Sequence, residues 1–271
     1  MNRWTWQQVH DLEYLTVPAW QERGAKAVFT ARSGGCSNSP YNSLNLGLHV
    51  GDDAEKVLHN RRRLAEIFAA EPGDLVSCQQ VHGNQVGIVT EAHRGRGAFS
   101  DQDSISAWDG MITAQPGLVL ATFYADCIPL LFFDPIRQVV ATAHSGWKGT
   151  YMRIAAQTVT VMTKNLGCSP ADIQVWLGPG IGACCYRIQA DLLDKVRDGF
   201  HDFSDIIYED EQGCTWDLKA TNAQILMEAG IPGDNIITCP LCTACDAGRF
   251  FSYRRDGGTT GRMGAAIALL K

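Results

Sequence analysis

Apolar runs separated by glycine, proline and polar clusters divide the chain into short segments of strand and helix character. Three central runs, residues 118–124, 130–133 and 139–143, are rich in aliphatic, β-branched and aromatic residues, which favour strands. Asp134 and Pro135 separate the last two runs, so this region predicts a buried hairpin. The other predicted strands are residues 27–30, 75–78, 85–90, 173–177 and 265–270.

Helical periodicity occurs in segments that alternate irregularly with these strands. Residues 52–70 place apolar side chains on one helical face, and Asp52 or Asp53 is suited to begin the helix. The other predicted helices are residues 152–166, 190–200 and 219–229. We find no linker and no repeat, so we expect one α/β domain of α+β type over residues 1–271, with mixed β-sheets flanked by helices. The pattern does not determine the strand order.

Composition narrows the functional classes. The chain has 271 residues, of which 45% are hydrophobic and 19% are charged, and this suits a compact protein with its own core. A formal net charge of −6 argues against a general binder of nucleic-acid backbones. The longest apolar run, residues 118–133, is interrupted by Asp126 and Pro129 and is shorter than the roughly 20 residues of a membrane-spanning helix. We expect neither a nucleic-acid nor a membrane partner.

The first residues and the cysteine content indicate a compartment. Residues 1–20 contain no apolar stretch preceded by basic residues, so they do not predict a signal peptide. We therefore expect a cytoplasmic protein whose ten cysteines are reduced. Reduced cysteines are available as metal ligands, nucleophiles or core residues.

Three segments place a histidine or a cysteine beside glycine or proline at the expected end of a strand. They are residues 80–83 with His82, 124–129 with Cys127 and 143–149 with His144. If these strand ends meet at one rim, two imidazoles and a thiolate form a three-ligand site with an open fourth position, as catalytic zinc uses. The spacing alone is equally compatible with hydrogen-bonded structural histidines and a core cysteine.

The same three segments resemble the signature motifs of the YfiH family, described as laccase-domain or polyphenol oxidase proteins and as zinc-dependent purine nucleoside phosphorylases. Further matching blocks are residues 32–35, 45–47, 60–61, 178–182, 184–186, 242–243, 252–255 and 261–262. The resemblance implies a YfiH-like fold and a zinc ion bound by His82, Cys127 and His144. It also implies phosphorolysis of adenosine, inosine and methylthioadenosine, together with deamination of adenosine. Purine nucleosides and phosphate are the expected small-molecule partners.

Deamination requires proton transfer beside an activated water, and Asp126, adjacent to Cys127, is the candidate proton shuttle. Successive strand residues point to opposite faces, so Asp126 can instead orient the backbone or a ligand imidazole. Trp147 and Tyr186 are candidates for stacking on a purine base, although a tryptophan between glycine and lysine is more typical of packing.

Phosphorolysis requires a phosphate held against the sugar, and four basic residues are candidates. Arg32, Arg254 and Arg262 offer guanidinium groups that match phosphate oxygens, and Lys148 lies in a glycine-rich connection between a predicted strand and helix. Arg32 and Lys148 are the preferred candidates because they lie in the family's motif blocks. Lys148 replaces the arginine that is usual in the family, which keeps the charge but loses the bidentate geometry.

Other functions use the same residues. A four-copper oxidase needs many imidazoles, and seven histidines with no His-x-His pair exclude it, although copper can substitute for zinc in one site as a polyphenol oxidase centre. A cysteine hydrolase would use Cys127 as nucleophile and His82 or His144 as base. The family has also been linked to the correction of peptidoglycan precursors, which fits a hydrolase. A non-catalytic purine sensor is a further alternative.

Residues 239–245 repeat a Cys-x-x-Cys spacing that also occurs in structural zinc and iron–sulfur sites. Only Cys242 and Thr243 match the family pattern, and no fourth cysteine follows at cluster spacing. The sequence therefore does not by itself predict a second metal.

Overall fold

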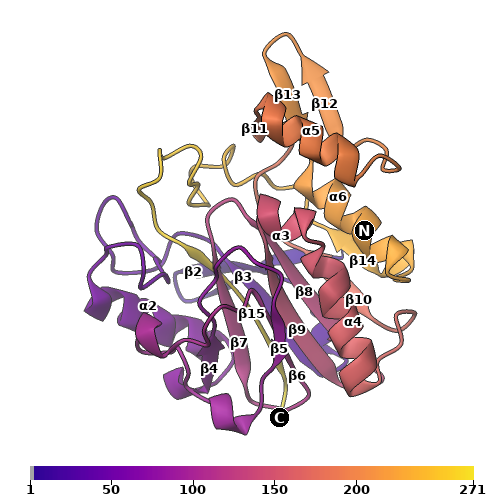
Figure 1. Ribbon diagram of the computed structural model, residues 1–271. Helices are drawn as coiled ribbons and strands as arrows, with labels where there is room; N and C mark the ends of the chain where they lie inside the picture. Colours follow the sequence, from indigo (N-terminus) through magenta and orange to yellow (C-terminus); the bar gives the residue numbers. More distant parts are fainter. Residues whose placement is uncertain (1–2) are drawn as a thin grey trace.

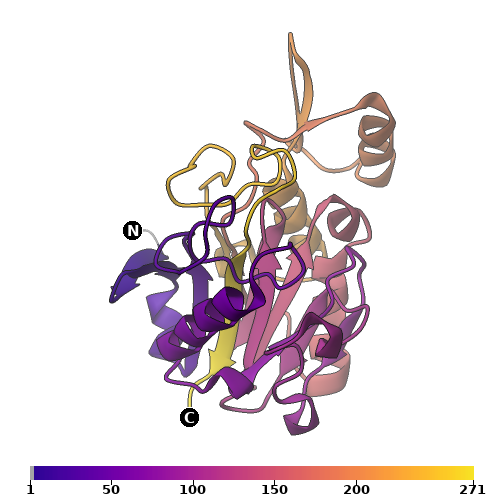
Figure 2. The same cartoon turned by 90° about the vertical axis from the view of Figure 1, so that its left-hand side faces the viewer.

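A computed structural model describes residues 3–271 and places two six-stranded sheets face to face (Figures 1 and 2). The first sheet contains, in spatial order, β1 (Thr5–Val9), β2 (Leu12–Thr16), β3 (Ala25–Thr30), β15 (Met263–Leu269), β7 (Val119–Tyr124) and β4 (Leu75–Ser77). The second contains β14 (Ile236–Thr238), β10 (Gln174–Leu177), β8 (Ile128–Asp134), β9 (Val139–Ser145), β6 (Gly110–Thr113) and β5 (Val86–Ile88). Both sheets combine parallel and antiparallel pairs.

The strands of the second sheet are buried on both faces. In β8, Leu131 and Phe133 contribute to the core between the two sheets, whereas Leu130 and Phe132 contribute to the core beneath the helices. Because strand side chains alternate between faces, a strand covered on both sides needs apolar residues at consecutive positions. This requirement explains the consecutive apolar residues 130–133, and the antiparallel β8–β9 pair confirms the predicted hairpin.

Helices cover the outer faces of both sheets. The helix α2 (Ala54–Ile67) packs on the first sheet, and α4 (Ile154–Leu166) and α6 (Leu218–Glu228) pack on the second (Figure 1). The carboxylate of Asp53 begins α2 by accepting the Glu55 N–H at 2.9 Å. These helices confirm three of the predicted segments, and the arrangement confirms the expected mixed sheets flanked by helices.

A smaller unit projects from this body, at the top of Figure 1. It consists of β11 (Arg187–Ile188), α5 (Ala190–Gly199), β12 (Ile207–Asp210) and β13 (Gly213–Trp216), with strand order β11-β13-β12. The remaining short elements are α1 (Pro18–Gln21), α3 (Trp147–Tyr151) and the 3-10 turns at Pro72–Asp74, Glu91–His93, Asp101–Asp103 and Gly233–Asn235.

The sequence pattern missed the shortest and most polar strands. The β1–β2 hairpin was not predicted, since β1 is mostly exposed and carries two consecutive glutamines. The four residues of β6 were also missed, although all four are buried. Within residues 3–271, no helix is long and apolar enough to cross a membrane.

Candidate metal centre

The three predicted ligands come together at the edge where the chain passes from one sheet to the other. His82 lies between β4 and β5, Cys127 lies in the tight connection from β7 to β8, and His144 is the penultimate residue of β9. One ligand atom from each residue lies within 4.8 Å of the other two. The imidazole rings are 4.8 Å apart between centroids and meet edge to face at 75°. The predicted convergence of these side chains is thus present in the structure.

A buried carboxylate, Asp109, shapes the loop that carries His82. Its oxygens accept the backbone N–H groups of Val81 at 3.2 Å, His82 at 3.0 Å and Gly83 at 2.6 Å. His82 has a φ of +61°, a left-handed conformation that is uncommon for a non-glycine residue. The three hydrogen bonds stabilise this turn and direct the imidazole toward the centre.

Asp109 also orients the second imidazole. Its Oδ1 lies 2.9 Å from Nδ1 of His144, and both side chains are almost completely buried. This bond leaves Nε2 as the ring nitrogen available to a metal, which is the usual carboxylate–histidine arrangement behind metal ligands. Sequence reasoning missed Asp109. Its only local signal was a position before Gly110 at the start of a strand, which is equally typical of a turn aspartate.

The thiol and the imidazoles influence each other's charge. Burial alone raises the pKa of Cys127, but the charge of His144 and hydrogen bonds with His144 and His82 outweigh burial and lower this pKa to about 6. Burial lowers the pKa of His144, whereas the Cys127 thiolate and Asp109 raise it to about 9. One thiolate and two imidazole nitrogens are a donor set that fits zinc or copper.

Gly146 provides the space that these ligands occupy. A Cβ atom at this position would lie 2.8 Å from Sγ of Cys127 and 3.1 Å from Cδ2 of His82. The Gly146 φ of −77° is accessible to any residue, so the constraint is steric and not conformational.

The ligands line a cavity of about 580 Å³, a volume typical of small-molecule sites. Its other walls include aromatic and basic side chains, among them His49, Trp147, Tyr186, Tyr253, Arg254 and Arg262. His49 was not a sequence candidate. Burial and the nearby Arg262 charge lower its pKa, which favours a neutral imidazole.

The four predicted phosphate-binding residues separate into two pairs. Arg254 and Arg262 line the cavity, whereas among the described residues Arg32 and Lys148 do not. Arg32 donates to the carbonyl oxygens of Asn42 and Ala247 and lies 4.5 Å from the Phe251 ring centroid. Lys148 is exposed beside Trp147. Phosphate binding by Arg32 and Lys148 stays a prediction that the cavity geometry does not support.

Asp126 lines the cavity but has hydrogen-bond partners for both carboxylate oxygens. Thr243 Oγ1 donates to Oδ1 at 2.7 Å, and the Arg254 backbone N–H donates to Oδ2 at 2.7 Å. The carboxylate therefore positions the backbone of Arg254 beside the cavity. Its role as a proton shuttle stays a prediction.

Two packed mixed sheets with a His₂Cys group at the base of an aromatic and basic cavity define a metalloenzyme-like α/β protein. The chain belongs to the family described as multi-copper polyphenol oxidoreductase laccase, which matches residues 26–270. The expected resemblance to YfiH proteins is confirmed.

Relatives of this chain carry names from purine nucleoside metabolism. Purine nucleoside phosphorylase YlmD from Geobacillus stearothermophilus is 41% identical over 246 residues, covering 90% of each chain. The crystal structure of YlmD from Geobacillus stearothermophilus has a TM-score of 0.93 at 40% identity and covers 98% of this chain and 99% of that chain. Adenosine deaminase RL5, from an unknown prokaryotic organism, is 31% identical and covers 90% of this chain and 94% of the relative.

Replacing Asp109 by asparagine tests its control of the centre. In Asp109→Asn the amide N–H groups would face backbone N–H groups and the His144 ring, which need an acceptor. We therefore expect metal affinity to fall about 10- to 100-fold. Competition with a chelator of known affinity measures the change. The exposed Asp172→Asn variant is the control, and equal metal affinity in the two variants would contradict the assignment.

Adding one methyl group tests the steric role of Gly146. The Gly146→Ala methyl displaces the Cys127 thiol, and we expect metal affinity to fall by about tenfold or more while the far-ultraviolet circular dichroism is unchanged. Gly73→Ala is the matched control because no atom lies within 4 Å of the added Cβ. Normal metal affinity in Gly146→Ala would show that the site does not need this space.

Proposed function

We propose that the protein is a zinc-dependent purine nucleoside phosphorylase that acts on adenosine, inosine and methylthioadenosine and also deaminates adenosine. The observation that carries this proposal is the placement of the His₂Cys group and two arginines in one cavity. The names of the relatives support the choice of purine nucleosides as the substrate class.

Zinc is the proposed metal because two imidazoles and one thiolate match its catalytic ligand sets. Three protein ligands leave room for a further ligand from the substrate or from water. Zinc held by these residues would act as a Lewis acid toward a substrate group or a water molecule. Asp109 keeps His144 in the required tautomer, and Gly146 leaves space for the thiol.

Aromatic residues on the cavity wall are suited to hold the purine. The rings of Tyr186 and Trp147 are half-buried at the cavity surface, so each offers one face to a planar base. Arg254 lies over the Tyr186 ring at 5.0 Å from its centroid, and this contact holds the ring in place at the cavity wall.

Arg254 and Arg262 are suited to hold phosphate because each is already anchored at one end. Nη1 of Arg254 donates to the carbonyls of Cys185 and Arg187, each at 3.2 Å. Nη1 of Arg262 donates to the carbonyls of Thr260 and Gly261 at 2.8 and 3.0 Å. Within residues 3–271, the Nη2 group of neither arginine has a protein acceptor. Anchored guanidinium groups bind an anion with little further loss of freedom and can stabilise charge that develops during phosphorolysis.

Product identification with and without phosphate tests the proposed reaction. Adenosine and inosine should give free base and ribose 1-phosphate when phosphate is present, and adenosine should give inosine without it. His82→Ala and His144→Ala should each reduce both activities at least about 100-fold, since each removes a metal ligand.

Metal removal distinguishes this reaction from that of a cysteine hydrolase, which would use the same thiol and imidazoles. A chelator should abolish turnover and zinc should restore it. Turnover that survives chelation but is lost on alkylation of Cys127 would instead establish a nucleophilic cysteine.

The arginine assignment predicts a selective effect on phosphate. Arg262→Lys keeps the charge but loses the bidentate fork, so the KM for phosphate should rise about tenfold, while phosphate-independent deamination changes little. Arg32→Lys is the matched control because Arg32 binds backbone carbonyls outside the cavity. A larger phosphate KM in Arg32→Lys than in Arg262→Lys would reverse the assignment.

A further inference from the structure

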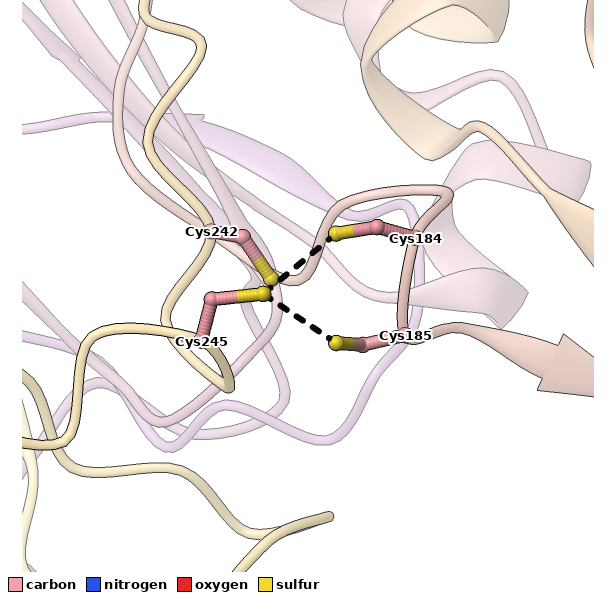
Figure 3. A group of neighbouring side chains, drawn as sticks. All are labelled: Cys184, Cys185, Cys242 and Cys245. Carbon is pink, nitrogen blue, oxygen red and sulfur yellow. Dashed lines mark hydrogen bonds between the residues drawn. The ribbon is translucent and has the colours of Figure 1, made fainter.

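Four cysteines that the proposed reaction does not use gather beside the cavity. They come from two distant segments, Cys184 and Cys185 in one and Cys242 and Cys245 in the other. Figure 3 shows the four thiols pointing toward a common centre from two facing loops. All four sulfur atoms lie within 4.8 Å of one another.

The sulfur positions resemble the corners of a tetrahedron around a metal. Sγ of Cys245 lies 3.6 Å from Sγ of Cys184 and 3.4 Å from Sγ of Cys185. Four thiolates at the usual zinc–sulfur distance of about 2.3 Å are separated from one another by about 3.8 Å. Small movements of the side chains would therefore bring all four into a zinc coordination sphere. A disulfide would need two sulfurs at about 2.05 Å.

Backbone donors around Cys242 favour a thiolate. The Gly182 N–H donates to Sγ of Cys242 at 3.2 Å. Hydrogen bonds from N–H groups to sulfur stabilise the charged form that binds a cation.

A buried ammonium group lies behind the same loop. Lys219 is 5% exposed, and its Nζ donates to the carbonyls of Cys239 at 2.8 Å and Leu241 at 2.7 Å. A divalent cation with four thiolates carries a net charge of −2 by formal count, and a neighbouring ammonium offsets part of it.

We propose that Cys184, Cys185, Cys242 and Cys245 bind a second zinc ion in a closed tetrathiolate site, separate from the His₂Cys centre. Four protein ligands leave no open position, so the role of this ion is structural. Cys239, the other cysteine of the repeated spacing, is fully buried in the core between the sheets and takes no part.

This second ion would fix one wall of the cavity. Tyr186 directly follows Cys185, and Arg254 donates to the Cys185 carbonyl. The projecting unit also begins here, since β11 starts at Arg187. The zinc would link the loop entering this unit to the loop after β14.

Metal analysis in a background without the first centre tests the proposal. The His82→Ala/His144→Ala double variant, purified anaerobically with zinc, should retain about one zinc per chain. Its X-ray absorption should show about four sulfur neighbours at about 2.3 Å and no nitrogen. Adding Cys242→Ser and Cys245→Ser to this variant should remove the zinc. A chelator should lower the Tm of the variant with an intact cluster, and it should leave the Tm of the serine variant unchanged.

The exposed Cys36→Ser substitution in the same background is the control and should leave zinc content and Tm unchanged. The zinc of the cysteine cluster is measured in a variant that lacks the first centre. Absence of this zinc would therefore overturn the structural site without contradicting the proposed reaction. The double variant needs no change in the cluster, so its absorption spectrum decides the question even if the cysteine variants do not fold. Zinc absent from that variant, two disulfides in the native protein, or iron in place of zinc would each overturn the proposal.

Discussion

One buried carboxylate determines the geometry of the metal centre. Asp109 accepts three successive backbone N–H groups from the loop carrying His82 and bonds to Nδ1 of His144. A buried carboxylate is costly unless its oxygens are paired, and these four donors pair it completely. The same bonds that compensate for its burial therefore fix two ligands relative to each other. Loss of this one group would affect the turn, the tautomer and the ligand spacing together.

The third ligand lies where the chain crosses from the first sheet to the second. The connection from β7 to β8 passes from one sheet to the other, and Cys127 lies within it. The chain makes this crossing in three residues, with Asp126 at a φ of +89°. Asp126 stabilises the crossing through bonds to Thr243 and Arg254. Fold and site are thus linked, because the same turn closes the core and presents the thiol.

The sequence predicted features that depend on local periodicity or on a recognisable ligand type. The apolar runs identified β7, β8 and β9, and the three segments with His82, Cys127 and His144 predicted ligands that do converge. Asp109 was missed because its importance comes from partners that are far away in sequence. The cysteine cluster was missed for the same reason: Cys184 and Cys185 reach Cys242 only through the fold. Arg32 shows the converse, since a motif residue there contacts backbone carbonyls outside the cavity.

The metal-binding side chains of this protein can be compared with the family's description as a multi-copper laccase. The residues that the structure describes provide two candidate metal groups, one with two histidines and one thiol, the other with four thiols. Neither combines the several imidazoles that a cluster of copper ions requires, and among residues 3–271 His49 is the one further histidine on the cavity wall. A His₂Cys group binds a single ion, and by the Irving–Williams order copper(II) competes strongly with zinc there. Copper in that position would supply redox chemistry from a single ion and would not make the protein a multi-copper enzyme.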